Sequence, residues 1–189
     1  MRNRFPSPVF ETLHLRLRVI EPGDEEFLAS LDSDPVVMQY IHSGALSRIG
    51  AMQWAQAQIE MAPHRWHLRK WIVELRDSRT KVGWMELSKF RGVFDPAENS
   101  LGDDVSLGFE LARAHWNGGL ATEAARPIIA YAFETLGLAR VVAFVHPCNS
   151  RSARVLEKLG FRQHASGRHQ DEGGNECRLY ALLADGWRP

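Results

Sequence analysis

The stretch HWNGGLATEA, residues 115–124, places two adjacent glycines directly before a run of helix-forming residues. Glycine is costly to order, so two in a row indicate either a tight turn or a need for bare backbone. Bare backbone at a helix N-terminus lets a negatively charged group approach the first N–H groups and the positive end of the helix dipole. Taken alone, the glycines fit a structural turn better than a phosphate site.

The segments on either side predict a strand before the glycines and a helix after them. Residues 105–112 form one apolar strand pattern, and from 122 to 136 the apolar residues follow helical spacing. Pro127 lies early in this helix and is expected to cause a slight kink. A strand, a glycine loop and a helix in this order can hold a diphosphate. The chain has no Gly-Lys-Ser/Thr and no G-x-G-x-x-G, which argues against the loops of nucleoside-triphosphate and dinucleotide sites.

The rest of the chain predicts further strands and helices. Residues 13–20 alternate, with Leu13 expected on the buried face, and Asp24 is expected to cap the next helix through its side chain. The other expected strands are 71–77, 82–90, 140–146, 161–168 and 176–183; the other expected helices are 47–61 and 149–161; and 91–104 is expected to be a polar loop. This order predicts one α/β domain, an α+β mixed sheet, over residues 1–189.

Composition narrows the class of protein. The 189 residues are 44% hydrophobic and 24% charged, as in an ordinary globular protein. Lys and Arg together equal Asp and Glu at 23 each, so the zero formal charge argues against nucleic acid as the main partner. There are only two cysteines, and no run approaches 18 apolar residues. We therefore expect no disulfide framework, no zinc site, no membrane span, no signal peptide at the start, and a cytoplasmic location.

A second motif follows the strand 140–146. With the glycine loop, NSRSARVLEKLGF (149–161) resembles the GNAT superfamily of acyl-CoA-dependent N-acetyltransferases, in particular the branch that contains the ribosomal-protein alanine N-acetyltransferases. The family loop, Q/R-x-x-G-x-G/A, is matched by Gly119 and Ala121, with Trp116 in place of Gln or Arg. The second motif, N-x-x-S-x-x-V/L-x-E-K-x-G-F, is matched by Asn149, Ser152, Val155, Glu157, Lys158, Gly160 and Phe161. The resemblance extends over nearly the whole chain.

The resemblance implies a single-domain GNAT-like fold whose central, mostly antiparallel sheet is splayed between the fourth and fifth strands and flanked by helices. It also implies acetyl-CoA as the co-substrate, and no metal. The diphosphate would contact the backbone amides of the glycine loop, and pantetheine would pair with the fourth strand. The coenzyme-binding residues implied in this way are Phe109, Leu111, Arg113, Asn117, Gly118, Gly119, Leu120, Ala121, Thr122 and Asn149. Asn149 can cap its helix and contact pantetheine at once.

The reaction implied is transfer of an acetyl group from acetyl-CoA to a primary amine, by direct attack in a ternary complex. The amine must lose a proton first, and Glu110 is the candidate base, although it could be a plain exposed strand carboxylate. Ser152 holds the position that assists the leaving thiolate in this branch, and its alternative role is to solvate the first helical turn. A backbone N–H in the 109–111 region would polarise the thioester carbonyl.

Other interpretations stay open at this stage. The chain could be a non-catalytic acyl-CoA-binding sensor or scaffold, or a cysteine hydrolase that uses Cys148 and His146. The acceptor, set by the helices at 24–61 and the loop at 91–104, could be a protein N-terminus, an antibiotic amine, a polyamine or an amino acid. The basic, aromatic segment HRWHLRKW (64–71) is interpreted as a solvated edge, and Trp54 as a core or pocket residue. No membrane partner is expected, and a homodimer is compatible with the sequence.

Overall fold

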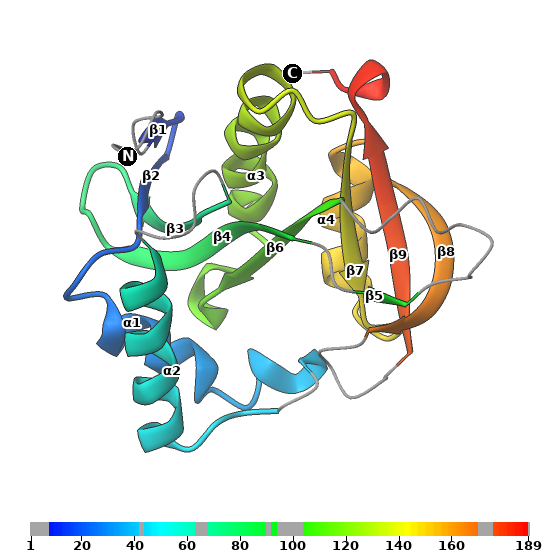
Figure 1. Ribbon diagram of the computed structural model, residues 1–189. Coiled ribbons are helices and arrows are strands. Elements are labelled where there is room, and N and C mark those ends of the chain that lie inside the picture. The colour runs from blue at the N-terminus through cyan, green and yellow to red at the C-terminus, as the bar shows by residue number, and fades with distance from the viewer. Residues whose placement is uncertain are drawn as a thin grey trace.

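The computed structural model describes residues 8–41, 44–62, 68–89, 92–93, 104–169 and 176–188. Its strands form one nine-stranded sheet in the order β1-β2-β3-β4-β6-β7-β9-β8-β5 (Figure 1). All neighbouring strands are antiparallel except β6 and β7, which are parallel. The mixed, mostly antiparallel sheet with flanking helices confirms the predicted fold class.

The longer elements agree with the sequence pattern to within a few residues, but β1 was not predicted, and β5 is a short strand inside the segment predicted as a loop, where it pairs with β8. The strands are β1 (Phe10–Glu11), β2 (Leu15–Val19), β3 (Lys70–Leu75), β4 (Lys81–Lys89), β5 (Gly92–Val93), β6 (Val105–Leu111), β7 (Arg140–Val145), β8 (Arg162–His169) and β9 (Glu176–Leu183). The α-helices are α1 (Glu25–Asp32), α2 (Arg48–Met61), α3 (Leu120–Ala130) and α4 (Ser150–Lys158). Most of the predicted loop at 91–104 lies outside the described residues.

The sheet divides between β6 and β7. The two strands pair only at their first residues, Val105 with Val141 and Ser106 with Val142. In contrast, β6 pairs with β4 over its whole length. The strands therefore part after Ser106 and leave two half-sheets, β1–β4 with β6 and β7–β9 with β5 (Figure 1). This is the splay that was predicted between the fourth and fifth strands.

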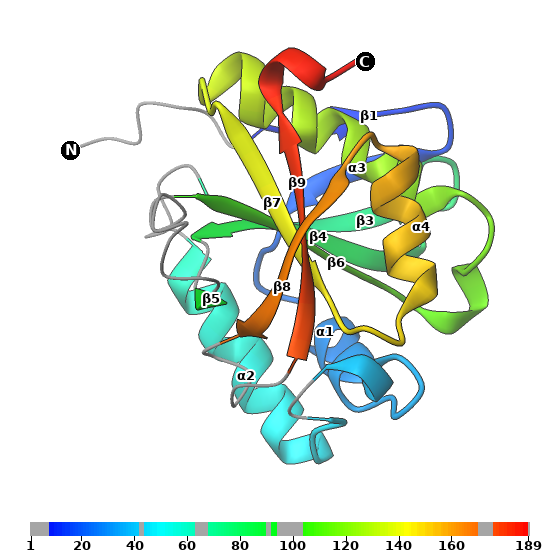
Figure 2. The ribbon, with the colours of Figure 1, turned by 90° about the vertical axis from the view of Figure 1, so that its right-hand side faces the viewer.

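Each face of the sheet has its own set of helices. One face packs against α3 and α4, in a core that includes Trp71, Met85 and Ile128. This core draws residues from both half-sheets, so α3 joins them (Figure 2). The opposite face packs against α1 and α2 through Ile72 and the partly buried Trp84. None of the helices within the described ranges is long and apolar enough to cross a membrane.

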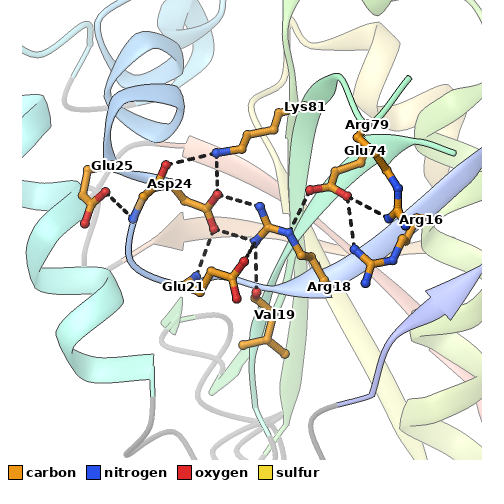
Figure 3. A network of polar contacts seen from close by, with 10 residues as sticks. Arg16, Arg18, Val19, Glu21, Asp24, Glu25, Glu74, Arg79 and Lys81 are labelled. Atoms are coloured by element: carbon orange, nitrogen blue, oxygen red, sulfur yellow. Dashed lines mark hydrogen bonds and ion pairs between the residues drawn. The ribbon is translucent and has the colours of Figure 1, made fainter. Parts of the chain in front are cut away.

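Asp24 is the N-cap residue of α1, as predicted, but its side chain makes no hydrogen bond to the helix N–H groups. Its carboxylate accepts hydrogen bonds from Arg18 at 2.7 and 2.8 Å and lies 2.6 Å from Lys81 Nζ (Figure 3). Arg18 also donates to Glu74 at 2.8 Å. Burial alone would raise the pKa of Asp24, but the hydrogen bonds from Arg18 and Lys81 hold it below its usual range. The network fastens the start of α1 to β2, β3 and β4.

Three further expectations were wrong. Leu13 is 74% exposed, because it lies in the turn before β2 rather than on its buried face, and Trp54 is 54% exposed on the outer side of α2. In the segment 64–71, residues 64–67 lie outside the described part, while Arg69 and Lys70 are buried rather than on a solvated edge. Lys70 is buried because β3 lies between two strands, β2 and β4.

The predicted helix at 122–136 begins two residues earlier and changes character near its end. It is α-helical through Ala130, and Tyr131–Thr135 forms a π-helical turn. The irregularity is therefore a π-helical turn that begins about one turn after Pro127, whereas the sequence predicted a slight kink caused by Pro127. The turn sets the Tyr131 ring edge-on to Trp71, with ring centroids 6.0 Å apart.

Candidate active site

The two helices that begin at the splay define the candidate site. Because β6 and β7 are parallel and part after their first residues, their C-terminal ends lie at the open end of the splay. The chain passes from β6 to α3 through residues 112–119, and from β7 to α4 through residues 146–149. The two connections meet, since the Arg151 guanidinium of α4 lies 5.0 Å from the centre of the Trp116 ring. In open sheets, ligands bind beyond the carboxyl ends of such strands.

The glycine loop is shaped to expose backbone N–H groups. Asn117 and Gly119 both have positive φ, of 63° and 78°, and Gly119 is the N-cap of α3. A Cβ at Gly119 would meet nothing within 4 Å, so its backbone conformation, and not lack of space, is what favours glycine there. A helix leaves its first N–H groups without a partner inside the helix, and here these belong to Leu120, Ala121 and Thr122. This arrangement suits an anion.

Trp116 has a structural role that explains why it can replace the usual Gln or Arg. Its indole Nε1 donates a hydrogen bond of 2.6 Å to the carbonyl oxygen of Leu111, the last residue of β6. Its backbone N–H donates to the Arg113 carbonyl at 3.2 Å. Arg113 itself is exposed at the start of a 3₁₀ turn, Arg113–His115. Trp116 therefore fixes the start of the glycine loop against the end of the strand.

The open edge of β6 presents backbone groups to the splay. The Ala112 N–H donates to the Val82 carbonyl at 2.8 Å, so the backbone of Ala112 faces β4. Because alternate residues of a strand point to opposite edges, the N–H and C=O groups of Phe109 and Leu111 face the open side. The Leu111 carbonyl accepts the hydrogen bond from Trp116. The Leu111 N–H and both the N–H and the C=O of Phe109 therefore face the open side of β6. An extended ligand with amide groups can pair with such an edge.

The start of α4 carries the two residues of the second motif. Asn149 Oδ1 accepts a hydrogen bond of 3.1 Å from the Ser152 N–H, which confirms the predicted cap. The amide nitrogen of Asn149 is not used by this cap. Ser152 is partly buried in the first turn.

The cysteine–histidine pair is not arranged for nucleophilic catalysis. His146 Nδ1 accepts from the backbone N–H of Cys148 at 3.1 Å, and the His146 ring stacks on Tyr40 with centroids 5.3 Å apart. Cys148 is exposed. Among the described residues, no hydrogen bond joins the Cys148 thiol to this ring.

Glu110 lies on the α1 and α2 side of β6, within a polar group. Trp84, directly opposite on β4, donates from Nε1 to Glu110 Oε2 at 3.1 Å. The strands are so close here that a Cβ at Gly83 would lie 2.2 Å from the Glu110 carbonyl oxygen. Burial raises the pKa of Glu110 to about 7, against the opposing charge of Lys70. The residue is only partly exposed and is ready to exchange a proton near neutral pH.

The residues around Glu110 were not singled out by the sequence. Lys70 Nζ lies 3.2 Å from Glu86 and 3.6 Å from the centre of the Trp84 ring. Asp32, the last residue of α1, raises the pKa of Glu110 as a neighbouring negative charge, as does Glu86. The hairpin register and the β4–β6 pairing bring these groups together, and neither is a local feature of the sequence.

The parting of the sheet beside a helix start that suits an anion, and the strand edge open to an extended ligand, are compatible with an acyl-CoA type of co-substrate. The family comparison agrees. Residues 14–162 match the model of the acetyltransferase (GNAT) domain, so the chain belongs to the GNAT acetyltransferase family. Enzymes of this family are N-acetyltransferases that take acetyl-CoA as co-substrate.

Relatives and solved structures resemble the chain over most of its length. The uncharacterized N-acetyltransferase YoaA of Bacillus subtilis is 28% identical over 182 residues, which is 93% of this chain and 97% of YoaA. The ribosomal-protein-S5-alanine acetyltransferase of Vibrio fischeri has a TM-score of 0.70 at 20% identity, over 96% of this chain and 100% of that one. The spermidine N-acetyltransferase of Vibrio cholerae, solved with CoA and spermine, has a TM-score of 0.73 at 18% identity, over 93% and 98%. These two similarities concern the fold.

Proposed function

We propose that residues 1–189 form one N-acetyltransferase domain that transfers the acetyl group of acetyl-CoA to a primary amine, by direct attack in a ternary complex. The observation that carries this proposal is Glu110, a carboxylate with a pKa of about 7 on the strand that borders the splay. The acceptor is a small-molecule amine or a protein N-terminus. Two structural neighbours are named for acetylation of such amines, spermidine and a ribosomal-protein alanine.

The co-substrate is held by the glycine loop, the edge of β6 and the start of α4. The diphosphate binds the N–H groups from Asn117 to Thr122, where two positive φ angles and the dipole of α3 favour an anion. Pantetheine pairs with the carbonyl of Phe109 and the N–H of Leu111 and accepts a hydrogen bond from the Asn149 amide. Arg113 is exposed beside the loop and adds positive charge.

Glu110 acts as the base. At neutral pH about half of it is ionised, given its pKa of about 7, so it can take a proton from an arriving ammonium group directly or through water. The neutral amine nitrogen then attacks the thioester carbon, and the carbon–sulfur bond breaks as the amide forms. One backbone N–H, that of Phe109, stabilises the oxyanion that develops on the carbonyl, while the Phe109 carbonyl and the Leu111 N–H pair with pantetheine. Trp84 keeps the carboxylate oriented through its hydrogen bond of 3.1 Å.

Ser152 assists the departing thiolate. Its N–H is fixed by Asn149 at 3.1 Å, which sets the serine in the first turn of α4. From there the hydroxyl donates to the sulfur as negative charge develops on it. The proton removed from the amine leaves through Glu110, and the thiolate is protonated to give free CoA.

The test is thiol release from acetyl-CoA with a panel of primary amines, followed by pH–rate profiles of Glu110→Gln and Ser152→Ala. Glu110→Gln is expected to lower kcat/KM by about 10²–10⁴-fold near neutral pH, and the loss should shrink at high pH, where the amine arrives already neutral. Ser152→Ala is expected to lower kcat at every pH with little change in acetyl-CoA affinity. Glu176→Gln, which removes an exposed carboxylate at the start of β9, is the control.

Two outcomes would overturn parts of this proposal. Tight binding of acetyl-CoA without amine-dependent thiol release would make the protein a sensor or scaffold. A Glu110→Gln enzyme with wild-type rates at all pH values would remove Glu110 from the mechanism and leave catalysis to the positioning of thioester and amine.

A further inference from the structure

Asp32 is a buried carboxylate without a full set of partners. It is the last residue of α1, it is 7% exposed, and its Oδ2 makes no hydrogen bond to any part of the chain that the structure describes. Its backbone carbonyl accepts a hydrogen bond of 2.8 Å from the Leu46 N–H. A buried charge without a partner is costly, and native proteins keep few of them without a functional reason.

Asp32 faces the same polar group as Glu110. Helix α1 packs on β4, the strand that carries Trp84 and Glu86. Burial raises the pKa of Asp32, and the positive charge of Lys70 opposes this rise, so Lys70 lies within electrostatic reach of its carboxylate. Asp32 in turn acts on Glu110. The carboxylates of Asp32 and Glu110 therefore border one region on the α1 and α2 side of the sheet.

The charges of this region do not balance. Among the residues that the structure describes, it contains three carboxylates, Asp32, Glu86 and Glu110, and one buried cation, Lys70. Lys70 Nζ forms an ion pair with Glu86 Oε2 at 3.2 Å and lies 3.6 Å from the centre of the Trp84 ring. Glu110 holds the hydrogen bond from Trp84 and, in the proposed function, receives the proton of the reacting amine. Asp32 is left as a buried carboxyl group whose Oδ2 has no partner among the described residues and which the reacting amine does not satisfy.

We propose that Asp32 binds a second cationic group of the acceptor, so that the preferred substrates are small amines that carry two positive charges, such as α,ω-diamines. The inference rests on the proposed function, because it takes the reacting amine to lie beside Glu110. A cation at Asp32 supplies the missing hydrogen-bond donor and compensates for the burial of the carboxylate. A hydrogen bond to a charged group is worth about 10- to 100-fold in affinity.

The test compares diamines, from diaminopropane to diaminohexane, with alkylamines of the same chain lengths as acceptors. For the wild-type protein we expect kcat/KM to be about 10- to 100-fold higher for the best diamine than for its matched alkylamine. Asp32→Asn should abolish this ratio by slowing the diamine far more than the alkylamine, with both acceptors compared at the pH optimum of each protein, because Asp32 also raises the pKa of Glu110. Glu26→Gln removes the same charge from the exposed side of α1 and should keep the ratio. The same kcat/KM comparison between a dipeptide amide that contains a lysine and its alanine counterpart tells whether Asp32 also accepts the second charge from a peptide.

The outcomes separate this inference from the proposed function. Equal rates for diamines and alkylamines in the wild-type protein would overturn the role of Asp32 while acetyl transfer stands. A parallel fall for both acceptors in Asp32→Asn would also overturn it, since that result means Asp32 only positions Lys70. If no amine is acetylated, the proposed function fails. In that case, calorimetry of diaminobutane binding to the CoA-loaded protein tests the cation site at Asp32 without activity. If diaminobutane does not bind, or binds Asp32→Asn as tightly as the wild type, the site at Asp32 is overturned.

Discussion

Replacing Glu110 by glutamine is expected to stabilise the protein while it slows the reaction. Burial raises the pKa of Glu110 from 4.5 to about 7, so the folded protein favours the protonated, neutral form. Glutamine is neutral at every pH and keeps an oxygen that can accept the hydrogen bond from Trp84. The variant therefore removes the cost of ionising a buried carboxylate but preserves its packing.

The size and the pH range of the effect follow from the two pKa values. Between about pH 4.5 and 7 the folded state of the wild type binds a proton that the unfolded state has lost, so wild-type stability falls as the pH rises through this window. Each pKa unit corresponds to about 1.36 kcal/mol, so the full difference amounts to about 3 kcal/mol above pH 7. Because the side chain is partly exposed, this is the maximum. At pH 5 the expected gain is below about 1 kcal/mol.

The assay is urea denaturation of the wild type, Glu110→Gln and the exposed control Glu176→Gln at pH 5 and pH 8.5. The free energy of unfolding of Glu110→Gln should exceed that of the wild type by about 3 kcal/mol at most at pH 8.5, and much less at pH 5. The control should differ little from the wild type at either pH. A Glu110→Gln protein with the same stability gain at both pH values would refute the reasoning, because its effect would then not come from ionisation.

Two further predictions concern the glycine loop and the network at α1. Gly119→Val should weaken acetyl-CoA binding in calorimetry and lower the free energy of unfolding by about 1–3 kcal/mol. Gly137→Val is the control, because Gly137 has a similar φ but lies outside the loop; it should lower the free energy of unfolding by a similar amount and leave acetyl-CoA binding intact. Equal binding losses in both would remove the loop from coenzyme recognition. Asp24→Asn should lower the free energy of unfolding at neutral pH by at most about 3–5 kcal/mol in urea denaturation, because it removes the buried charge that Arg18 and Lys81 share, although Arg18 keeps its ion pair with Glu74. Since the pKa of Asp24 is held below 3.8, the wild type should lose this contribution as the pH falls below about 4, and the variant should lack that acid transition.

Local features, which depend on residues close together along the chain, could be predicted from the sequence. The glycine pair before helix-forming residues and the asparagine cap of α4 are each decided within a few residues, and both lie where expected. The parting of β6 and β7 came from the family resemblance, because no single strand pattern contains it.

The sequence could not predict the contacts that the sheet creates. Asp24 has the residue type and the position of a cap, but Arg18 and Lys81 reach it from β2 and β4 and outcompete the helix N–H groups. Lys70 follows a polar stretch and was expected at a solvated edge, yet its strand is central and Glu86 stands opposite. The partners of Glu110 were missed for the same reason, since strand register decides them.

The parting of the strands leaves an edge strand in the interior of the sheet. Beyond Ser106, the side of β6 that faces β7 has no strand paired to it. Unpaired edges are places where a second chain can add a strand, and proteins usually cover or charge them. A co-substrate that lies along this edge covers it, and a ligand at 100 times its dissociation constant adds about 2.7 kcal/mol to stability. If the proposed function holds, bound coenzyme would therefore also protect this edge from self-association, and the protein should aggregate less with acetyl-CoA present than without it.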